Sequence, residues 1–479
     1  MELASEYDVV VLGTGLIESI LAAAKQLLES GRASSETSAA LLAEQQSYAL
    51  DLAPRILFGA GPMVDALLAS GGHHCTEFKL LQSWHMVLPG IEGSSSSPST
   101  AAPYDLVPVP ISKAGIFANK RLSLADKRVL MRFLKHVMAQ EENDRESKEG
   151  PPAQGPSLAA ALDAQGVRRP LLRQVLTHGV LLAEAAEDVS LASARRSLEL
   201  LEASTGRYGP DAGPYLSPLY GSAELAQAFS RSAAVNGAVQ ILRCNAAVEP
   251  QGVRVAWGEG AEAVSHVAAA RQVIVPRAGR DRVRRCIVVL RGVPDRLHQA
   301  LFVLPEEGAE EIGVTWALLL GPSVRVCPAD RCLLHVWRRG SEDDGGAEQA
   351  LQPAIDRIVS ALQTSIDAQA GEDAVEGETM KATIESTIFL KENNVEEYTV
   401  PESANCIVCP GPGAGVLADE ALDVARDLYL RHLDADKKGF PFDPKPAPAD
   451  AEEAASDDET IGALEAALGR TVVAAGLDT

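Results

Sequence analysis

The sequence predicts an α/β protein in which a larger domain of mixed β-sheets carries an inserted all-helical domain. An apolar run followed by two glycines and a helical pattern occupies residues 7–24, and helical periodicity dominates residues 123–204. Short β-rich runs separated by turn residues then fill most of residues 237–411. We therefore expect a discontinuous α/β domain at 1–122 and 205–440, a helical insert at 123–204, and an acidic, proline-rich tail at 441–479 with a short terminal helix.

Composition excludes some classes of partner. The chain of 479 residues has a net charge of −23, which argues against a nucleic acid or an anionic membrane as the main partner, because phosphate contacts need clustered Lys and Arg. The acidic runs at 141–150 and 452–460 are typical of solvated loops. No stretch reaches the roughly 18 consecutive apolar residues that a membrane-spanning helix requires. We expect a soluble, cytoplasmic protein.

The first element is a strand, a glycine turn and a helix, YDVVVLGTGLIESILAAA at residues 7–24. Gly13 and Gly15 match a dinucleotide-binding turn, but Glu18 stands where that motif needs a small residue for close packing of helix and strand. A carboxylate there would also oppose a bound pyrophosphate. We interpret the turn as vestigial, with no cofactor bound.

The region after this helix also departs from a dinucleotide fold. A second parallel strand ending in an acid should follow about 20 residues past the glycines, and the polar residues 31–46 show no β-rich run. Pro62 after Gly61 then predicts a short helix with Val64, Leu67 and Leu68 on one face. Residues 76–90 predict one or two strands.

The insert begins with the clearest helix of the chain. Residues 123–138 have a serine at the cap, an acid in the first turn and apolar residues at 129, 130, 133, 134 and 137. Three further helices are expected between residues 157 and 204. Beyond the insert, we expect a helix at about 222–236, strands at 238–248, 271–276, 285–290, 299–305, 312–321, 332–337 and 404–411, and helices at 351–371 and 419–433.

No catalytic or metal-binding constellation stands out. The pairs Cys327/Cys332 and Cys406/Cys409 lie in strand-like apolar sequence, so we expect buried free thiols rather than zinc ligands. The adjacent residues His73 and His74 should point to different faces, which argues against a shared metal. Neither glycine-rich segment near residues 59–66 and 411–418 carries the Lys-Ser or Lys-Thr ending of a phosphate-binding loop.

Several blocks together resemble one family, that of Rab escort proteins and Rab GDP dissociation inhibitors. In chain order they are YDVVVLGTGLIESILAAA, DLAPRILFGAGPMVDALL, KRLSLADKRVLMRFLKHVM, GRYGPDAGPYLSPLYGSAELAQAFSRSAAVNGAVQILR and CIVCPGPGAGVLADEALDVARDLY. The resemblance runs from residue 7 to about 433, and PLYG-x-x-EL with its following helix is its most specific part. The second and last blocks are closer to the escort branch.

The resemblance implies a Rossmann-type, FAD-binding-like fold reused for protein binding without a redox cofactor. An escort protein binds newly made, GDP-loaded Rab GTPases, presents them to the type II geranylgeranyl transferase and delivers the prenylated product to membranes. We therefore expect a non-catalytic accessory component, with Rab, the transferase, the prenyl lipid and, transiently, a membrane as partners. The alternatives are a Rab GDP dissociation inhibitor and a flavin-dependent, amine-oxidase-like enzyme.

The same resemblance assigns candidate Rab-binding residues. It carries Rab contacts onto Glu224 and Arg231, which are seven residues apart and so share a helix face. It also matches Val239 and Ile241 to small or apolar platform positions; the alternative for these two is a plain core strand. In the insert, a groove for the prenyl chain would need apolar lining, which Leu171, Leu172, Val175, Leu176, Leu181 and Leu182 could supply, although leucines at helical spacing are also typical of a core.

One departure from the family concerns residues 25–50. Family members usually have a second strand and a tyrosine-containing Y-G-G segment there, whereas Tyr48 of this chain lies in another context. Either the binding surface is reduced, or the gene model lacks sequence at this place.

Overall fold

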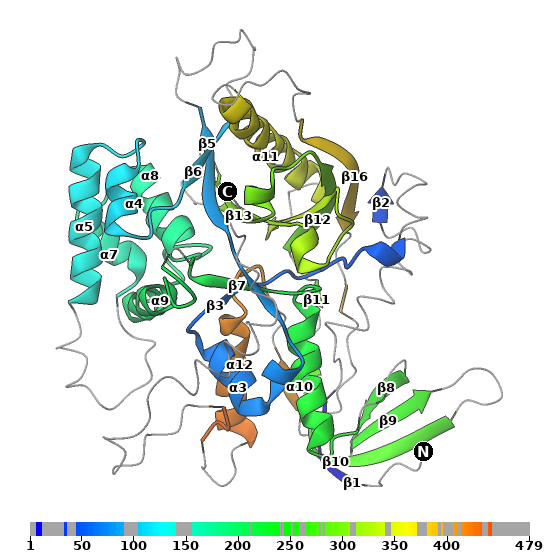
Figure 1. Ribbon diagram of the computed structural model, residues 1–479. Helices are drawn as coiled ribbons and strands as arrows, with labels where there is room; N and C mark the ends of the chain where they lie inside the picture. Colours follow the sequence, from blue (N-terminus) through cyan, green and yellow to red (C-terminus); the bar gives the residue numbers. More distant parts are fainter. Residues whose placement is uncertain are drawn as a thin grey trace.

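A computed structural model shows the arrangement of the elements (Figure 1). The structure describes residues 6–11, 33–35, 45–90, 104–139, 156–210, 212–239, 241, 244–250, 252–257, 264–276, 279–280, 283–306, 313–340, 346–370, 381–390, 394–395, 406–409, 413–433 and 439–442. Gly13, Gly15 and Glu18, the acidic runs at 141–150 and 452–460, and the expected tail helix lie outside these residues.

The largest sheet has eight strands in the order β2-β16-β12-β15-β14-β13-β5-β6. All neighbours are antiparallel except β13 and β5, which are parallel. The strands are β2 (Ala33–Ser35), β5 (Ser83–Pro89), β6 (Tyr104–Pro108), β12 (Val283–Arg291), β13 (Gln299–Pro305), β14 (Val314–Leu320), β15 (Cys332–Arg339) and β16 (Thr383–Leu390).

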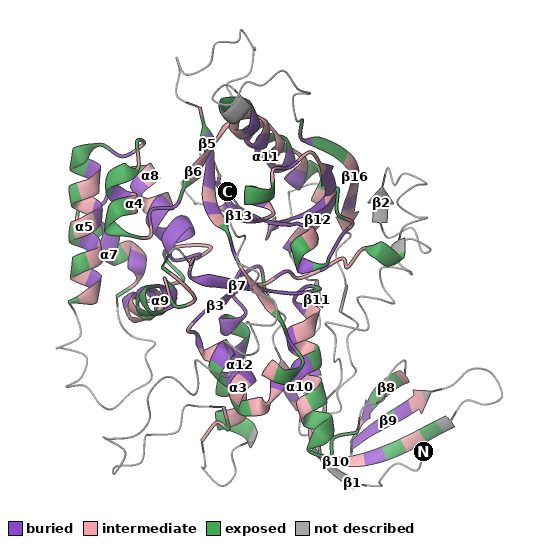
Figure 2. Cartoon of the chain, viewed as in Figure 1, coloured by how far each residue is buried: buried purple, intermediate pink, exposed green. Residues whose placement is uncertain are grey.

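Both faces of this sheet are covered. Every residue of β13 and β14 is buried, as expected for central strands with an apolar layer on each side. On one face, Phe302 and Leu334 pack with Ile358 of α11 (Ala347–Ala370). On the other face, Leu301 and Trp316 join a core that includes the helices of residues 124–204 (Figure 2).

A second, five-stranded sheet contains the N-terminal strand. Its strands are β1 (Glu6–Val11), β8 (Cys244–Glu249), β9 (Gly252–Trp257), β10 (Val264–Pro276) and β18 (Cys406–Cys409). The long strand β10 pairs with β9 in antiparallel fashion through its first half, and with β1 and β18 in parallel through its second half. The fold is therefore α/β with mixed sheets, as the sequence predicts.

The prediction of no strand at residues 31–46 is wrong in one respect. The three residues Ala33–Ser35 form β2, which pairs with β16 at the edge of the large sheet. This pairing needs only backbone groups, so the small polar side chains give no β signal. Among the described residues, β2 is not a neighbour of β1, so it does not take the place of the second strand of a dinucleotide fold.

Short elements connect the two large sheets. A three-stranded sheet of β3 (Leu57–Phe58), β7 (Tyr215–Pro218) and β4 (Phe78–Leu80) lies beside α3 (Pro62–Ser70), α10 (Ala223–Val235) and α12 (Asp419–Leu428). A two-stranded pair joins β11 (Gly279–Arg280) and β17 (Asn394–Val395). The remaining short turns of helix are η1 (Gln45–Ser47), η2 (Gly72–His74), η6 (Asp295–Leu297), η7 (Pro322–Val324) and η8 (Tyr429–Leu433).

The described elements between residues 113 and 204 are helices. They are α4 (Lys113–Ala118), α5 (Leu124–Met138), α7 (Leu158–Ala164), α8 (Pro170–Gln174), η4 (Val175–Val180) and α9 (Leu191–Ser204). Ser123 caps α5 in a capping box with Asp126, and Leu130, Phe133 and Val137 form its buried face. These helices form one side of the molecule in Figure 1.

Candidate functional site

The PLYG turn, Pro218 to Gly221, directs the chain from β7 into α10. Tyr220 and Gly221 have positive φ angles of 63° and 101°. Glycine suits the second position because left-handed backbone costs it nothing. A Cβ on Gly221 would also lie 3.1 Å from an oxygen of Asp51. The turn therefore depends on this glycine.

A buried carboxylate holds the start of α10. Asp51, 5% exposed, accepts hydrogen bonds from the amides of Ser222 at 2.6 Å and Ala53 at 3.0 Å. Ser222 precedes the helix, but its hydroxyl does not cap it; it accepts from the amide of Arg55 at 2.6 Å. The helix start is thus fixed by residues about 170 positions away in the chain.

Tyr220 is held at the surface from the opposite side. Its amide donates to the carbonyl of Val324 at 2.9 Å, and its hydroxyl accepts from Arg325 at 2.8 Å. Tyr220 remains 47% exposed. The turn therefore presents an oriented aromatic side chain next to α10.

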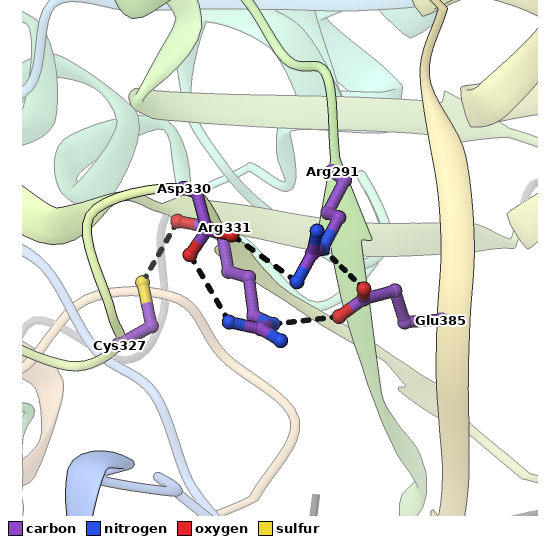
Figure 3. A network of polar contacts seen from close by, with 5 residues as sticks. All are labelled: Arg291, Cys327, Asp330, Arg331 and Glu385. Atoms are coloured by element: carbon purple, nitrogen blue, oxygen red, sulfur yellow. Dashed lines mark hydrogen bonds and ion pairs between the residues drawn. The ribbon is translucent and has the colours of Figure 1, made fainter. Parts of the chain in front are cut away.

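A polar network anchors the segment that carries Arg325 (Figure 3). Arg331 contacts Asp330 at 3.0 Å and Glu385 at 2.7 Å, and Arg291 contacts the same two acids. Cys327 donates from its thiol to the carbonyl of Arg331 at 3.0 Å. The network ties the segment after η7 to β12 and β16, and so fixes the backbone that supports Tyr220.

Glu224 and Arg231 both lie on α10. The buried residues Leu225 and Ala228 lie on the adjoining face of α10 and pack into a core that includes Leu67 of α3. Arg231 is exposed, and Glu224 is partly buried, which raises the pKa of its carboxyl. Within the described part of the chain, neither side chain has a hydrogen-bond or ion-pair partner. Helix α10 therefore carries two side chains of opposite charge, Glu224 and Arg231, and neither has a polar partner among the described residues.

The expected strand at Val239 and Ile241 is wrong. Neither residue lies in a strand, because α10 ends at Val235 and β8 begins at Cys244. Val239 is 49% exposed, whereas Ile241 packs against a core of Val248, Val253 and their neighbours. A turn at Asn236 and Gly237, where Gly237 has a φ of 96°, follows α10, and the strand predicted from residue 238 begins only at Cys244. Val239 alone of the two is accessible to a partner.

A second buried polar cluster joins α3 to α12. Asp419 accepts from the amides of Phe58 at 3.2 Å and Met63 at 3.1 Å, at the N-terminus of α3. Burial raises the pKa of Asp419 to about 6. Burial also raises the pKa of Glu420 to about 7, although the nearby Arg55 opposes the shift. Sequence reasoning missed this cluster and Asp51, since only the tertiary fold brings these residues to the backbone groups that they bind.

The leucine-rich segment of the insert is core in this structure. Leu172, Leu176 and Leu182 are each at most 2% exposed, within the same cluster as Leu130 and Phe133. Val175 and Leu181 are buried too, and Leu171 is half-buried. A prenyl chain would therefore need these helices to move apart.

Two predictions about the cysteines and histidines are wrong. Cys327 and Cys332 are buried, but Cys406 and Cys409 are only partly buried, because β18 pairs with β10 on one side. The rings of His73 and His74, both in η2, do not point apart: their centroids lie 3.9 Å from each other, with the ring planes tilted by 41°. No group of three metal-binding side chains is found among the described residues, nor is any described helix long and apolar enough to cross a bilayer.

Comparisons with known proteins agree on one family. Residues 23–295 match the family model described as GDP dissociation inhibitor. Rab escort protein 1 of Arabidopsis thaliana is 26% identical over 92% of this chain and 82% of its own length. Rab proteins geranylgeranyltransferase component A 1 of Rattus norvegicus is 23% identical over 81% of this chain, which spans 58% of the rat protein.

A solved structure shows the same fold. The crystal structure of Rab GDI from Plasmodium falciparum aligns with 89% of this chain and 98% of its own, with a TM-score of 0.59 and 16% identity. At this identity the likeness concerns the fold alone.

Proposed function

Because the chain belongs to the GDP dissociation inhibitor family, we propose that it acts as a Rab escort protein in the cytoplasm. It binds newly synthesised, GDP-loaded Rab GTPases, presents them to the geranylgeranyl transferase and delivers the prenylated product to membranes. The observation that carries this proposal is the similarity to the plant Rab escort protein over 92% of the chain.

The Rab-binding surface in this proposal is α10 with its preceding turn. Glu224 and Arg231 supply two charges without partners among the described residues, and Val239 adds an exposed apolar side chain beyond the helix. Ile241, partly buried against the core around Val248, is the second apolar residue of this proposed surface. Charge-assisted hydrogen bonds from the two ionic groups would fix the orientation of the GTPase.

The helical segment at 123–204 is the part that we propose faces the prenyl lipid and the transferase. The chain then contributes no catalytic group of its own and holds no cofactor, with the Gly13, Gly15 and Glu18 turn serving packing alone. A flavin absorbance band near one equivalent in the desalted protein would contradict this and favour the oxidase alternative.

A Rab GDP dissociation inhibitor is the second candidate, supported by the match of residues 23–295 to the family model described as GDP dissociation inhibitor. The two functions differ in a measurable way. An escort protein raises the rate at which the transferase modifies an unprenylated Rab, whereas an inhibitor extracts prenylated Rab from membranes. We expect stimulation of the transferase; extraction without stimulation would assign the chain to the inhibitor branch.

Charge reversal on α10 tests the proposed surface. Arg231→Glu should weaken Rab·GDP binding by several kcal/mol, because like charges would then meet across the interface. Since Arg231 is exposed, stability should change by no more than about 0.5 kcal/mol. Glu224→Arg should weaken binding similarly and also cost about 0.3–1 kcal/mol of stability, because it places a cation at the helix N-terminus.

The measurement is a titration of Rab·GDP into each variant, beside its thermal midpoint. Arg426→Glu on α12 is the control, since Arg426 is an exposed arginine on a different helix. Wild-type affinity in both α10 variants would refute this surface, and early melting of both would assign the two residues a structural role.

A further inference from the structure

Three non-glycine residues in the described part of the chain have a left-handed backbone. They are Leu182, Tyr220 and Arg325, with φ angles of 52°, 63° and 59°. A side chain makes this conformation unfavourable, so glycine is the usual residue at such positions. Ten described glycines of this chain do have positive φ angles. The chain therefore accepts a backbone cost at three places where glycine would avoid it.

Two of these three residues contact each other. Tyr220 lies in the PLYG turn before α10, and Arg325 follows η7, 105 positions further along the chain. The guanidinium of Arg325 donates to the hydroxyl of Tyr220 at 2.8 Å, and its central carbon lies 5.8 Å from the centroid of the tyrosine ring. The amide of Tyr220 also donates to the carbonyl of Val324 at 2.9 Å. The two strained turns therefore meet at one place.

Both side chains are accessible at the surface. Tyr220 is 47% exposed, and Arg325 is exposed as well. Within the described ranges, Arg325 forms no ion pair, and its hydrogen-bond partner is the neutral hydroxyl of Tyr220. The positive charge of Arg325 therefore has no carboxylate in contact with it among these residues.

The fold of the two turns does not depend on these side chains. The amide of Arg325 donates to the carbonyl of Pro322 at 2.9 Å, and the amide of Tyr220 donates to that of Val324, so the turns are closed by backbone groups. Glycine would keep both hydrogen bonds. An exposed contact between a cation and a ring contributes little to stability. Backbone strain that the fold does not require is typical of functional sites.

The two turns are also held firmly from behind. Asp51 accepts the amide of Ser222, two residues after Tyr220. Cys327, two residues after Arg325, donates to the carbonyl of Arg331 within the polar network of Figure 3. Side chains that are already fixed lose little conformational freedom when a partner binds. The pair is therefore preorganised.

We propose that Tyr220 and Arg325 form an anchor of the Rab-binding surface beside α10, in which Arg325 pairs with a carboxylate of the GTPase and an apolar side chain of the GTPase covers the Tyr220 ring. Tyrosine and arginine are among the residues that carry most of the binding energy at protein–protein interfaces. The inference rests on the proposed function and extends its surface from α10 to the segment after η7.

The chemistry of this surface favours a protein that carries charges of both signs. The planar fork of Arg325 matches a carboxylate. Glu224, four residues after Tyr220, brings a negative charge to the same end of α10. A uniformly anionic partner would be attracted by Arg325 and repelled by Glu224, whereas a GTPase surface with an acid and a base at fixed places can satisfy both.

Titration of Rab·GDP into full-chain variants, beside their thermal midpoints, tests the anchor. Arg325→Gly removes the side chain and the backbone strain together, so the affinity should fall at least about tenfold while the midpoint stays equal to or above that of wild type. Tyr220→Asn, which tolerates the left-handed backbone, should also lower the affinity at least about tenfold. Arg325→Lys keeps the charge without the fork and should lose only about threefold.

Charge reversal provides a matched control. Arg325→Glu should weaken binding more than Arg325→Gly does, because like charges would then meet across the interface. Arg426→Glu makes the same change at an exposed arginine of α12 and should keep wild-type affinity. Wild-type affinity in both Arg325→Gly and Tyr220→Asn would overturn the anchor. A fall in both midpoints that parallels the loss of affinity would also overturn it, because the pair would then be structural.

Failure of the anchor and failure of the proposed function give different results. If wild type binds Rab·GDP and Arg231→Glu weakens binding while Arg325→Gly does not, the surface on α10 stands and the anchor is refuted. If wild type binds no Rab·GDP, the proposed function fails and the anchor fails with it.

Discussion

Asp51 shows how one buried side chain can set the position of a helix start, here that of α10, on which we propose the Rab-binding surface. Its two carboxylate oxygens accept the amides of Ser222 and Ala53, and no local sequence pattern marks it. The spacing of Glu224 and Arg231 could be predicted from the sequence because a helix repeats every few residues. The contact that orients their helix could not, since it joins residues 171 positions apart.

Removal of this carboxylate should loosen the turn before α10. Asp51→Ala leaves the buried amide of Ser222 without an acceptor, which should lower the free energy of unfolding by about 1–3 kcal/mol. Urea denaturation measures the loss. Asp295→Ala, whose side chain is fully exposed, is the control and should change little. Equal stability of the Asp51 variant and wild type would show that water replaces the carboxylate.

Glu420 should make the stability depend on pH. Burial raises the pKa of its carboxyl from 4.5 to about 7, so the folded state binds a proton more tightly than the unfolded state does. Stability therefore falls as pH rises from about 4.5 to about 7. Glu420→Gln removes this titration, and at pH values above that window the variant should be more stable than wild type by about 1–3 kcal/mol.

Denaturation midpoints across this pH range measure the effect of Glu420→Gln. Asp419, whose pKa is raised to about 6, remains in the variant and should leave part of the pH dependence. Glu348→Gln removes an exposed acid of α11 and serves as the control. Parallel pH profiles for wild type and Glu420→Gln would contradict the account.

Among the strands, those with apolar residues on both faces could be predicted from the sequence, and strands with polar residues could not. The sequences of β13 and β14 are almost entirely apolar, which predicts strands buried on both faces, and every residue of both strands is buried. Strand β16 was missed because polar residues such as Thr383, Glu385 and Ser386 interrupt its apolar run. Strand β9 was missed for the same reason, since exposed Arg254 separates buried Val253 and Val255.

Helix α5 illustrates a local rule that holds in the structure. The hydroxyl of Ser123 accepts the amide of Asp126 at 3.2 Å, and the carboxylate of Asp126 accepts the amide of Ser123 at 2.9 Å. Ser123→Ala should therefore cost about 1 kcal/mol of stability. Thermal denaturation tests this against Gln227→Ala, an exposed change in α10. If both variants melt alike, the cap does not stabilise the helix.

The two large sheets of the fold separate β1 from β2, the first two strands of the described residues. Among the described residues, β1 has β10 as its neighbour, and the short strand β2 belongs to the other large sheet. The motifs in the sequence resemble those of one family, and the comparisons confirm that family and its fold. The distribution of charge over the surface did not follow from the net charge of −23, since the basic residues gather on α4 and α5.

We propose that α10 and its turn bind a GDP-loaded Rab GTPase, and the decisive experiment is a calorimetric titration of Rab·GDP into the full chain. We predict a saturable, stoichiometric complex that is weakened by Arg231→Glu and unchanged by Arg426→Glu. Absence of saturable binding to a panel of GDP-loaded Rab proteins, by a wild-type chain with a normal thermal transition, would contradict the account.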